Sequence, residues 1–137
     1  YRGIPLSRTA SQCINCSECV AHCVNGLNIA EKMRQAYQAA DVFIIPSLQE
    51  NLPNTILESL FCGTPVAGFE TGGIPEMVKT GITGFLAPCG DSVILAKAIH
   101  SALHQPPFSG ELPGYLAAYL PQSVNEKYTQ AMLATLG

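Results

Sequence analysis

From residue 28 onwards, segments with apolar side chains at helical spacing alternate with short continuous apolar runs. Apolar residues at helical spacing predict an amphipathic helix over residues 29–40. The continuous apolar run at residues 42–45 predicts a buried parallel strand. A second helix should open near Asn54, with Asn54 as its N-cap, and close at Gly63.

The same alternation continues through the middle of the chain. Residues 66–69 predict a strand, and Pro75 is well placed to begin a short helix that runs to Lys79. A turn and a strand at residues 85–87 should follow, and then a helix capped by Asp91. Three strands that alternate with helices predict an α/β fold with a short parallel sheet.

The composition divides the chain into three segments and limits its function. We predict a Cys-rich segment at residues 1–27, an α/β half-domain at 28–104, and a loop with short helices (114–120 and 124–136) within 105–137. With 47% hydrophobic and 12% charged residues, the chain can bury a core. A net charge of −3 gives no electrostatic case for nucleic acid or an anionic membrane.

The N-terminal sequence and the hydropathy bear on the location of the protein. The sequence contains no apolar run of about 18 residues, so we expect no transmembrane segment. The first residues lack a signal-peptide pattern, which predicts a cytoplasmic location. The chain begins at Tyr1 instead of Met, which suggests a processed product, a cloned fragment or an excerpt of a longer protein.

Two glutamates flank the expected junction between the first strand and the second helix. Glu50 lies in the loop, and Glu58 follows seven intervening residues later on the helix. A helix start offers free backbone N–H groups and a positive helix end to an anion. Carboxylates on either side could accept hydrogen bonds from sugar hydroxyls. This arrangement points to a phosphorylated sugar ligand.

The stretch 47–65 resembles the donor-site signature of retaining, nucleotide-sugar-dependent glycosyltransferases of the GT-B fold. The shared pattern is Glu, seven residues, Glu, and then a Cys-Gly-Thr-Pro turn. Residues 69–76 are similar to the Gly-Gly-x-Pro-Glu segment of the family, and residues 81–86 to the strand that follows it. The resemblance covers residues 29–103 and implies a partial Rossmann-like fold, the C-terminal half-domain of such an enzyme.

The resemblance implies roles for individual residues. Glu50 would contact the donor sugar at the catalytic centre, and Glu58 would bind the ribose hydroxyls of a UDP- or GDP-sugar. The full set of implied donor-binding residues is Glu50, Asn51, Leu52, Pro53, Asn54, Thr55, Glu58, Gly72 and Gly73. Transfer would be independent of metal ions and cofactors, in a polysaccharide or glycoconjugate pathway.

The chain also departs from the family pattern. Asn51 stands where the family usually has glycine, so the approach of the loop to the sugar is in doubt. The acceptor domain and the basic Arg/Lys pair that clamps the pyrophosphate have no counterpart in this sequence. We therefore expect donor binding, and no transfer by this chain alone.

Four cysteines near the N-terminus form a separate motif: Cys13, Cys16, Cys19 and Cys23. Their spacing, C-x2-C-x2-C-x3-C, is that of the bacterial ferredoxin run for a 4Fe-4S cluster. Residues 7–32 resemble the ferredoxin-like segment of some aldo/keto reductases. Val24 replaces the usual proline, and no second run follows, so zinc and free or vestigial thiols remain open alternatives.

Three hypotheses for function follow from the sequence. The first is a glycosyltransferase donor-binding domain. The second is an iron–sulfur electron-transfer or sensing module on an α/β scaffold. The third is a non-catalytic fragment useful only with a partner. The two resemblances meet near residues 29–33, which suggests a natural or artificial fusion or a misassembled N-terminus.

Overall fold

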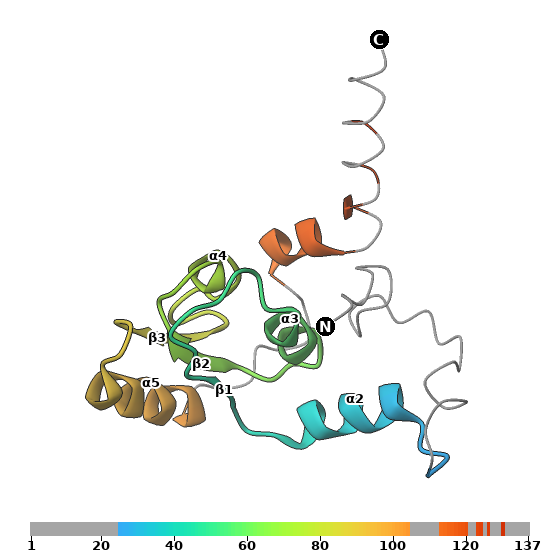
Figure 1. Ribbon diagram of the computed structural model, residues 1–137, viewed down its shortest axis with the longest axis horizontal. Coiled ribbons are helices and arrows are strands. Elements are labelled where there is room, and N and C mark those ends of the chain that lie inside the picture. The colour runs from blue at the N-terminus through green and yellow to red at the C-terminus, as the bar shows by residue number, and fades with distance from the viewer. Residues whose placement is uncertain (1–24, 105–112, 121–122, 125, 127–129, 131–137) are drawn as a thin grey trace.

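Helices and strands alternate along the chain, as the sequence predicts. A computed structural model describes residues 25–104, 113–120, 123, 124, 126 and 130. Its elements are α2 (Ile29–Ala39), β1 (Phe43–Ile45), α3 (Asn54–Phe61), β2 (Val66–Phe69), α4 (Ile74–Met77), β3 (Gly84–Ala87), α5 (Ser92–His104) and the 3-10 helix η3 (Gly114–Tyr119). Figure 1 shows α2 extending away from the sheet that β1, β2 and β3 form. The predicted α/β fold is confirmed.

The three strands form one parallel sheet in the order β1-β2-β3. Val66 in the central strand lies opposite Phe43 on one side and Gly84 on the other. Parallel neighbours need a crossover connection, and α3 and α4 lie within the two crossovers. The loops that follow the three strands therefore emerge at the same edge of the sheet.

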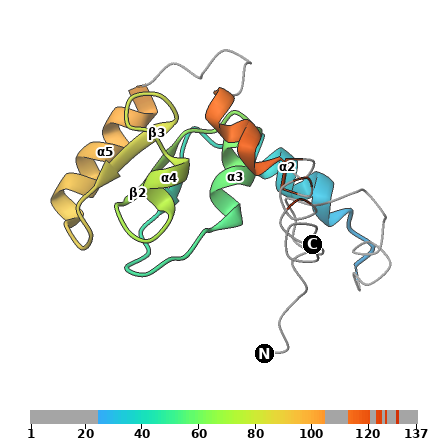
Figure 2. The same ribbon diagram turned by 90° about the horizontal axis from the view of Figure 1, so that it is seen from above.

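Helices cover both faces of the sheet (Figure 2). On one face α5 packs against β2 and β3, where Phe69, Ala87 and Leu95 form a small buried cluster. On the other face lie α3 and α4. The larger core there consists of Ile45, Ile56, Leu57, Leu60, Val66, Ile74, Met77, Val78 and Leu116. Leu116 comes from η3, so this C-terminal segment completes the core.

The helix ends agree with the sequence at some positions and differ at others. The Asp91 cap is confirmed, because its Oδ1 accepts the Ile94 N–H at 2.9 Å. The prediction that Asn54 caps α3 is wrong. Asn54 is the first helical residue, Pro53 occupies the capping position, and no side chain caps this end. Proline has no hydrogen-bonding side chain, so it cannot act as a side-chain cap.

Three other predictions need correction. Strand β1 is not buried throughout, because it forms an edge of the described sheet and Ile44 is 43% exposed. Helix α2 buries Tyr37, whereas Met33 on its apolar stripe is exposed. Helix α4 ends at Met77 instead of Lys79.

The C-terminal predictions are met in part. The helix expected over 114–120 is a 3-10 helix. Residues 123, 124, 126 and 130 are helical, and the rest of the helix expected over 124–136 lies outside the described residues. Within the described part of the chain, no helix is long and apolar enough to cross a membrane.

The loop after β1 is locked against the turn after β2. The Gly73 N–H donates to the Asn51 carbonyl at 2.6 Å. Gly72 has a φ of +53°, and a Cβ added to it would overlap the carbonyl oxygen of Glu50. Two features therefore require glycine at position 72, namely its positive φ and the close approach of the Glu50 loop.

This close approach predicts that Gly72→Ala displaces the Glu50 loop. A matched control is Gly63→Ala, because Gly63 also has a positive φ (+86°) but has no neighbour within 4 Å of an added Cβ. Both variants should lose about 1–2 kcal/mol of stability through left-handed strain in denaturant unfolding. Gly72→Ala alone should also shift the backbone amide NMR signals of residues 48–52. Unchanged signals there would contradict the proposed lock.

Candidate functional site

Three loops meet at the carboxyl ends of the parallel strands. The backbone carbonyl of Leu48, after β1, accepts the hydroxyl of Thr71, after β2, at 3.2 Å. The thiol of Cys89, after β3, points to the same carbonyl at 3.6 Å. In open α/β sheets, ligands bind at this edge. The predicted site residues that lie in loops, Glu50 among them, fall at this meeting point.

The first turn of α3 adjoins the Glu50 loop and has no side-chain cap. Its leading backbone N–H groups, at Asn54 and Thr55, precede the first internal helical bond, which Ile56 donates to Pro53 at 3.1 Å. Thr55 is exposed and Asn54 is half-buried. An uncapped helix start carries about half a positive charge and offers these donors to an anion. This end of α3 can therefore hold a phosphate group.

The other predicted residues of this loop differ in exposure. Asn51 and Leu52 are exposed, and Glu50 and Pro53 are half-buried. Gly73 is buried, and its N–H is already bonded to Asn51, so this donor supports the loop. The roles of these residues in donor binding stay predictions.

Glu58 lies one turn further along α3, about 6 Å from Asn54 along the helix axis. Its side chain is half-buried, and its Oε2 accepts the Tyr37 hydroxyl at 3.1 Å. Burial raises the pKa of Glu58, and the hydrogen bond from Tyr37 opposes that rise. A carboxylate in this position keeps one oxygen that Tyr37 does not occupy. It can accept hydroxyl groups of a ligand held at the helix start.

Tyr37 is the site residue that the sequence reasoning missed. The helical pattern placed it on an apolar stripe, and its ring does pack edge-on against Phe43, with centroids 5.7 Å apart. A buried tyrosine hydroxyl normally has a hydrogen-bond partner, which is the signal that could have drawn attention to it. Its partner Glu58 is 21 residues away, so the sequence did not identify the pair.

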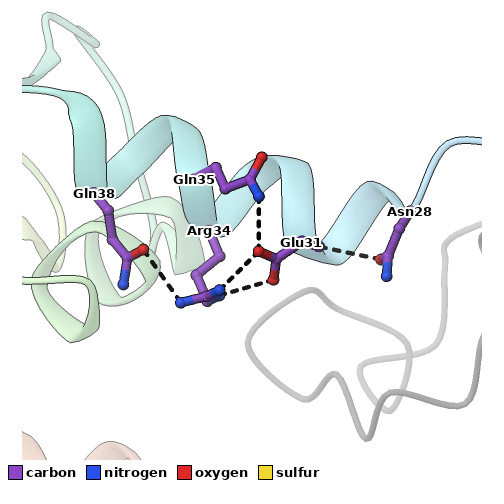
Figure 3. Close-up of polar contacts among 5 residues, drawn as sticks. All are labelled: Asn28, Glu31, Arg34, Gln35 and Gln38. Atoms are coloured by element: carbon purple, nitrogen blue, oxygen red, sulfur yellow. Dashed lines mark hydrogen bonds and ion pairs between the residues drawn. The ribbon is translucent and has the colours of Figure 1, made fainter.

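The basic side chain nearest in sequence to this region forms its contacts along its own helix. Figure 3 shows Arg34 of α2 bonded to both carboxylate oxygens of Glu31 and to Gln38. The Arg34–Glu31 ion pair is exposed, with N and O 2.7 Å apart. Hydrogen bonding to Glu31 raises the pKa of Arg34. Arg34 is thus engaged by side chains of its own helix.

The predicted iron–sulfur ligands, Cys13, Cys16, Cys19 and Cys23, lie outside the described residues. Within the described ranges, no group of three or more His, Cys, Asp or Glu side chains could hold a metal ion. The comparisons reported next give the iron–sulfur resemblance no support, so the cluster stays a prediction.

Comparisons with known proteins point to one family. Residues 9–105 match the family described as Glycosyl transferases group 1. The chain is 33% identical over 101 residues to a 2-deoxystreptamine N-acetyl-D-glucosaminyltransferase of Streptomyces fradiae, an alignment that covers 70% of this chain and 24% of that protein. It is 30% identical over 105 residues to a D-inositol 3-phosphate glycosyltransferase of Actinosynnema mirum, covering 77% of this chain and 25% of the relative.

A third relative is an amylovoran biosynthesis glycosyltransferase of Erwinia amylovora, 35% identical over 77 residues, or 52% of this chain and 19% of that protein. No solved structure matches the chain significantly. The chain thus spans about a quarter or less of the length of these curated relatives. The family match covers more than half of the chain and includes both glutamates and the two glycines. The chain belongs to the glycosyl transferases group 1 family.

Proposed function

We propose that this chain is the donor-binding part of a retaining, metal-independent glycosyltransferase and binds a UDP- or GDP-sugar. The observation that carries the proposal is the half-buried Glu58 carboxylate, one turn below the uncapped start of α3. The Glu50 loop beside this helix start adds a second carboxylate. The helix start would suit the diphosphate of a nucleotide sugar, Glu58 the ribose, and Glu50 the donor sugar.

The diphosphate would lie at the first turn of α3. A helix N-terminus stabilises a negative charge by about 0.3–1 kcal/mol at an exposed site and by about 2 kcal/mol in a partly buried one. This stabilisation needs no divalent cation. It would act on the ground state and more strongly on the leaving diphosphate, where charge develops during transfer.

The ribose would lie further along α3, where Glu58 accepts its hydroxyl groups. The donor sugar would lie on the other side of the diphosphate, next to Glu50. The proposal is confined to donor binding because the curated relatives in the comparison are about four or more times longer than the matched part. The acceptor and its binding surface would belong to another domain, with a polysaccharide or glycoconjugate as product.

The two glutamates should have separable effects on binding. Glu58→Ala should weaken both UDP and UDP-glucose by about 1.5–3 kcal/mol, the usual contribution of hydrogen bonds to a charged group. Glu50→Ala should weaken UDP-glucose and leave UDP unchanged. Calorimetry on the chain measures both affinities, with GDP and GDP-mannose as the alternative pair.

Glu31→Ala is a matched control, because Glu31 is a glutamate outside the site whose carboxylate is bonded to Arg34 and Gln35 on α2. It should bind both ligands as the parent chain does. Equal affinities for the parent chain and both site variants would sink the assignment.

The raised pKa of Glu58 predicts a conflict between stability and binding. Because burial raises this pKa in the folded state, the parent chain loses stability as the pH rises through the raised value. Glu58→Gln removes the buried charge, and its amide oxygen can still accept the Tyr37 hydroxyl. The variant should therefore melt at a higher temperature than the parent at neutral pH, and should have no such advantage below pH 4.5, the ordinary glutamate pKa.

The same Glu58→Gln variant should bind UDP more weakly than the parent, since an amide oxygen is a weaker acceptor than a carboxylate. Glu76→Gln, an exposed residue on α4, controls for the loss of a negative charge at the surface. Thermal melts of Glu58→Gln and the parent, from below pH 4.5 to neutral pH, test the predicted difference in stability. A melting temperature for Glu58→Gln below that of the parent at neutral pH would argue against a destabilising buried charge.

A further inference from the structure

Tyr37 is fixed on several sides at the C-terminal end of α2. Its side chain is 8% exposed, and its ring packs edge-on against Phe43 in β1. Its backbone carbonyl accepts the Thr64 hydroxyl, from the turn after α3, and the Ala40 N–H. These contacts join α2 to the sheet and to the end of α3. The phenol ring therefore has little freedom to turn away from α3.

The hydroxyl of this ring is directed at Glu58. It donates to Oε2 at 3.1 Å and crosses from α2 to α3. Burial and the Glu58 charge raise the pKa of Tyr37 to about 12, so the hydroxyl remains protonated at any physiological pH. It can therefore always donate. A donor aimed at a carboxylate favours the ionised form of that carboxylate and fixes its orientation.

A carboxylate has about four lone-pair sites on two oxygens. Tyr37 occupies one site on Oε2, and within the described ranges no second side-chain hydrogen bond reaches this carboxylate. A vicinal diol, such as that of ribose, presents two O–H donors side by side. A fixed, ionised Glu58 can receive both donors without first reorienting.

We propose that Tyr37 is a positioning residue for nucleotide binding, which holds the Glu58 carboxylate in the orientation that accepts the ribose diol. This inference rests on the proposed function. It adds a residue that is expected to touch no ligand and to act through Glu58. A purely structural role for Tyr37 is the competing explanation, because the ring is also part of the packing between α2 and β1.

Other groups also influence this carboxylate and its partner. Cys62 lies four residues after Glu58, at the C-cap of α3, and burial raises the pKa of its thiol. Arg34, on α2, opposes that rise through its positive charge. Among the described residues, Tyr37 acts on Glu58 directly, Cys62 is influenced by the Glu58 charge, and Arg34 acts on Cys62. Cys62 and Arg34 are unchanged in the test below.

Tyr37→Phe separates positioning from packing, because phenylalanine keeps the ring and removes only the hydroxyl. In calorimetry with UDP or GDP, whichever the parent chain binds, the variant should bind about tenfold more weakly at neutral pH, as expected when a hydrogen bond to a charged group is lost. Without the Tyr37 donor the pKa of Glu58 should rise further. The affinity should therefore begin to fall at a higher pH in the variant than in the parent as the solution is acidified.

Tyr115→Phe is the matched control. Tyr115 is another partly buried tyrosine, and its hydroxyl donates to the Met77 carbonyl at 3.0 Å and lies 2.8 Å from the Thr83 hydroxyl. This variant should lose stability and keep the affinity and pH profile of the parent. Carboxyl NMR titration of the ligand-free chain adds a readout that needs no ligand, in which the Glu58 signal should titrate at a higher pH in Tyr37→Phe alone.

The outcomes are distinct. Weaker binding by Tyr37→Phe, with the upward shift of the pH profile and of the Glu58 titration, supports the positioning role. Nucleotide binding and a pH profile equal to those of the parent overturn that role and leave the proposed function standing. A parent chain that binds neither UDP nor GDP overturns the proposed function, and the positioning role falls with it.

Discussion

Parallel pairing of three short strands is the constraint on which the rest of this structure depends. Parallel strands cannot be joined by tight turns, so each crosses to the next through a segment that contains a helix. The register pairs Ile45 with Gly68 and Phe69 with Ala87, so the carboxyl ends of the three strands lie within one residue of one another. The loops after the strands then meet around one carbonyl, that of Leu48. Residues distant in sequence become neighbours there.

Backbone contacts hold the Glu50 loop, and this explains why small residues matter beside it. Gly73 donates to the Asn51 carbonyl, and Gly72 lies so close to Glu50 that no side chain fits. Asn51 contributes its backbone carbonyl to this lock, and the residue is exposed. The loop shape is thus fixed by the turn after β2.

Glu58, the proposed ribose-binding residue, illustrates how a site carboxylate can reduce the stability of the fold that carries it. A half-buried carboxylate is harder to ionise than an exposed one, and an apolar or amide side chain in its place would burden the fold less. The Tyr37 hydroxyl partly offsets this burden, because it stabilises the ionised form. Such a compromise is expected where ligand binding requires a charged group whose burial makes folding less favourable. The same hydrogen bond links the outlying helix α2 to α3.

Local sequence patterns predicted the helices and strands well. They predicted the contacts between these elements much less well. The Asp91 cap follows from spacing within one helix, and it is present. The Asn54 cap failed because the sequence alone did not distinguish the capping position from the first helical residue. Burial of β1 was overestimated because the strand composition does not reveal its place at an edge of the sheet. The Tyr37–Glu58 bond depends on how two helices pack.

The family signature located the candidate site more directly than the periodicity did. Spacing alone marks Glu50 and Glu58 as two carboxylates near a helix start, a pattern that many surfaces share. The match to glycosyl transferases group 1 over residues 9–105 places both glutamates within one family pattern. The structure adds the physical context, namely an uncapped helix start, a locked loop and a half-buried carboxylate bonded to Tyr37.

The central claim is that the carboxyl edge of the sheet binds a nucleoside diphosphate through the start of α3. Its most direct test is a backbone amide NMR titration of the isotope-labelled chain with UDP and with GDP. The account predicts that the largest shifts fall on residues 50–58 and 71–73, at the carboxyl ends of β1 and β2. Shifts concentrated at the opposite edge of the sheet, or no shifts with either nucleotide, would contradict it.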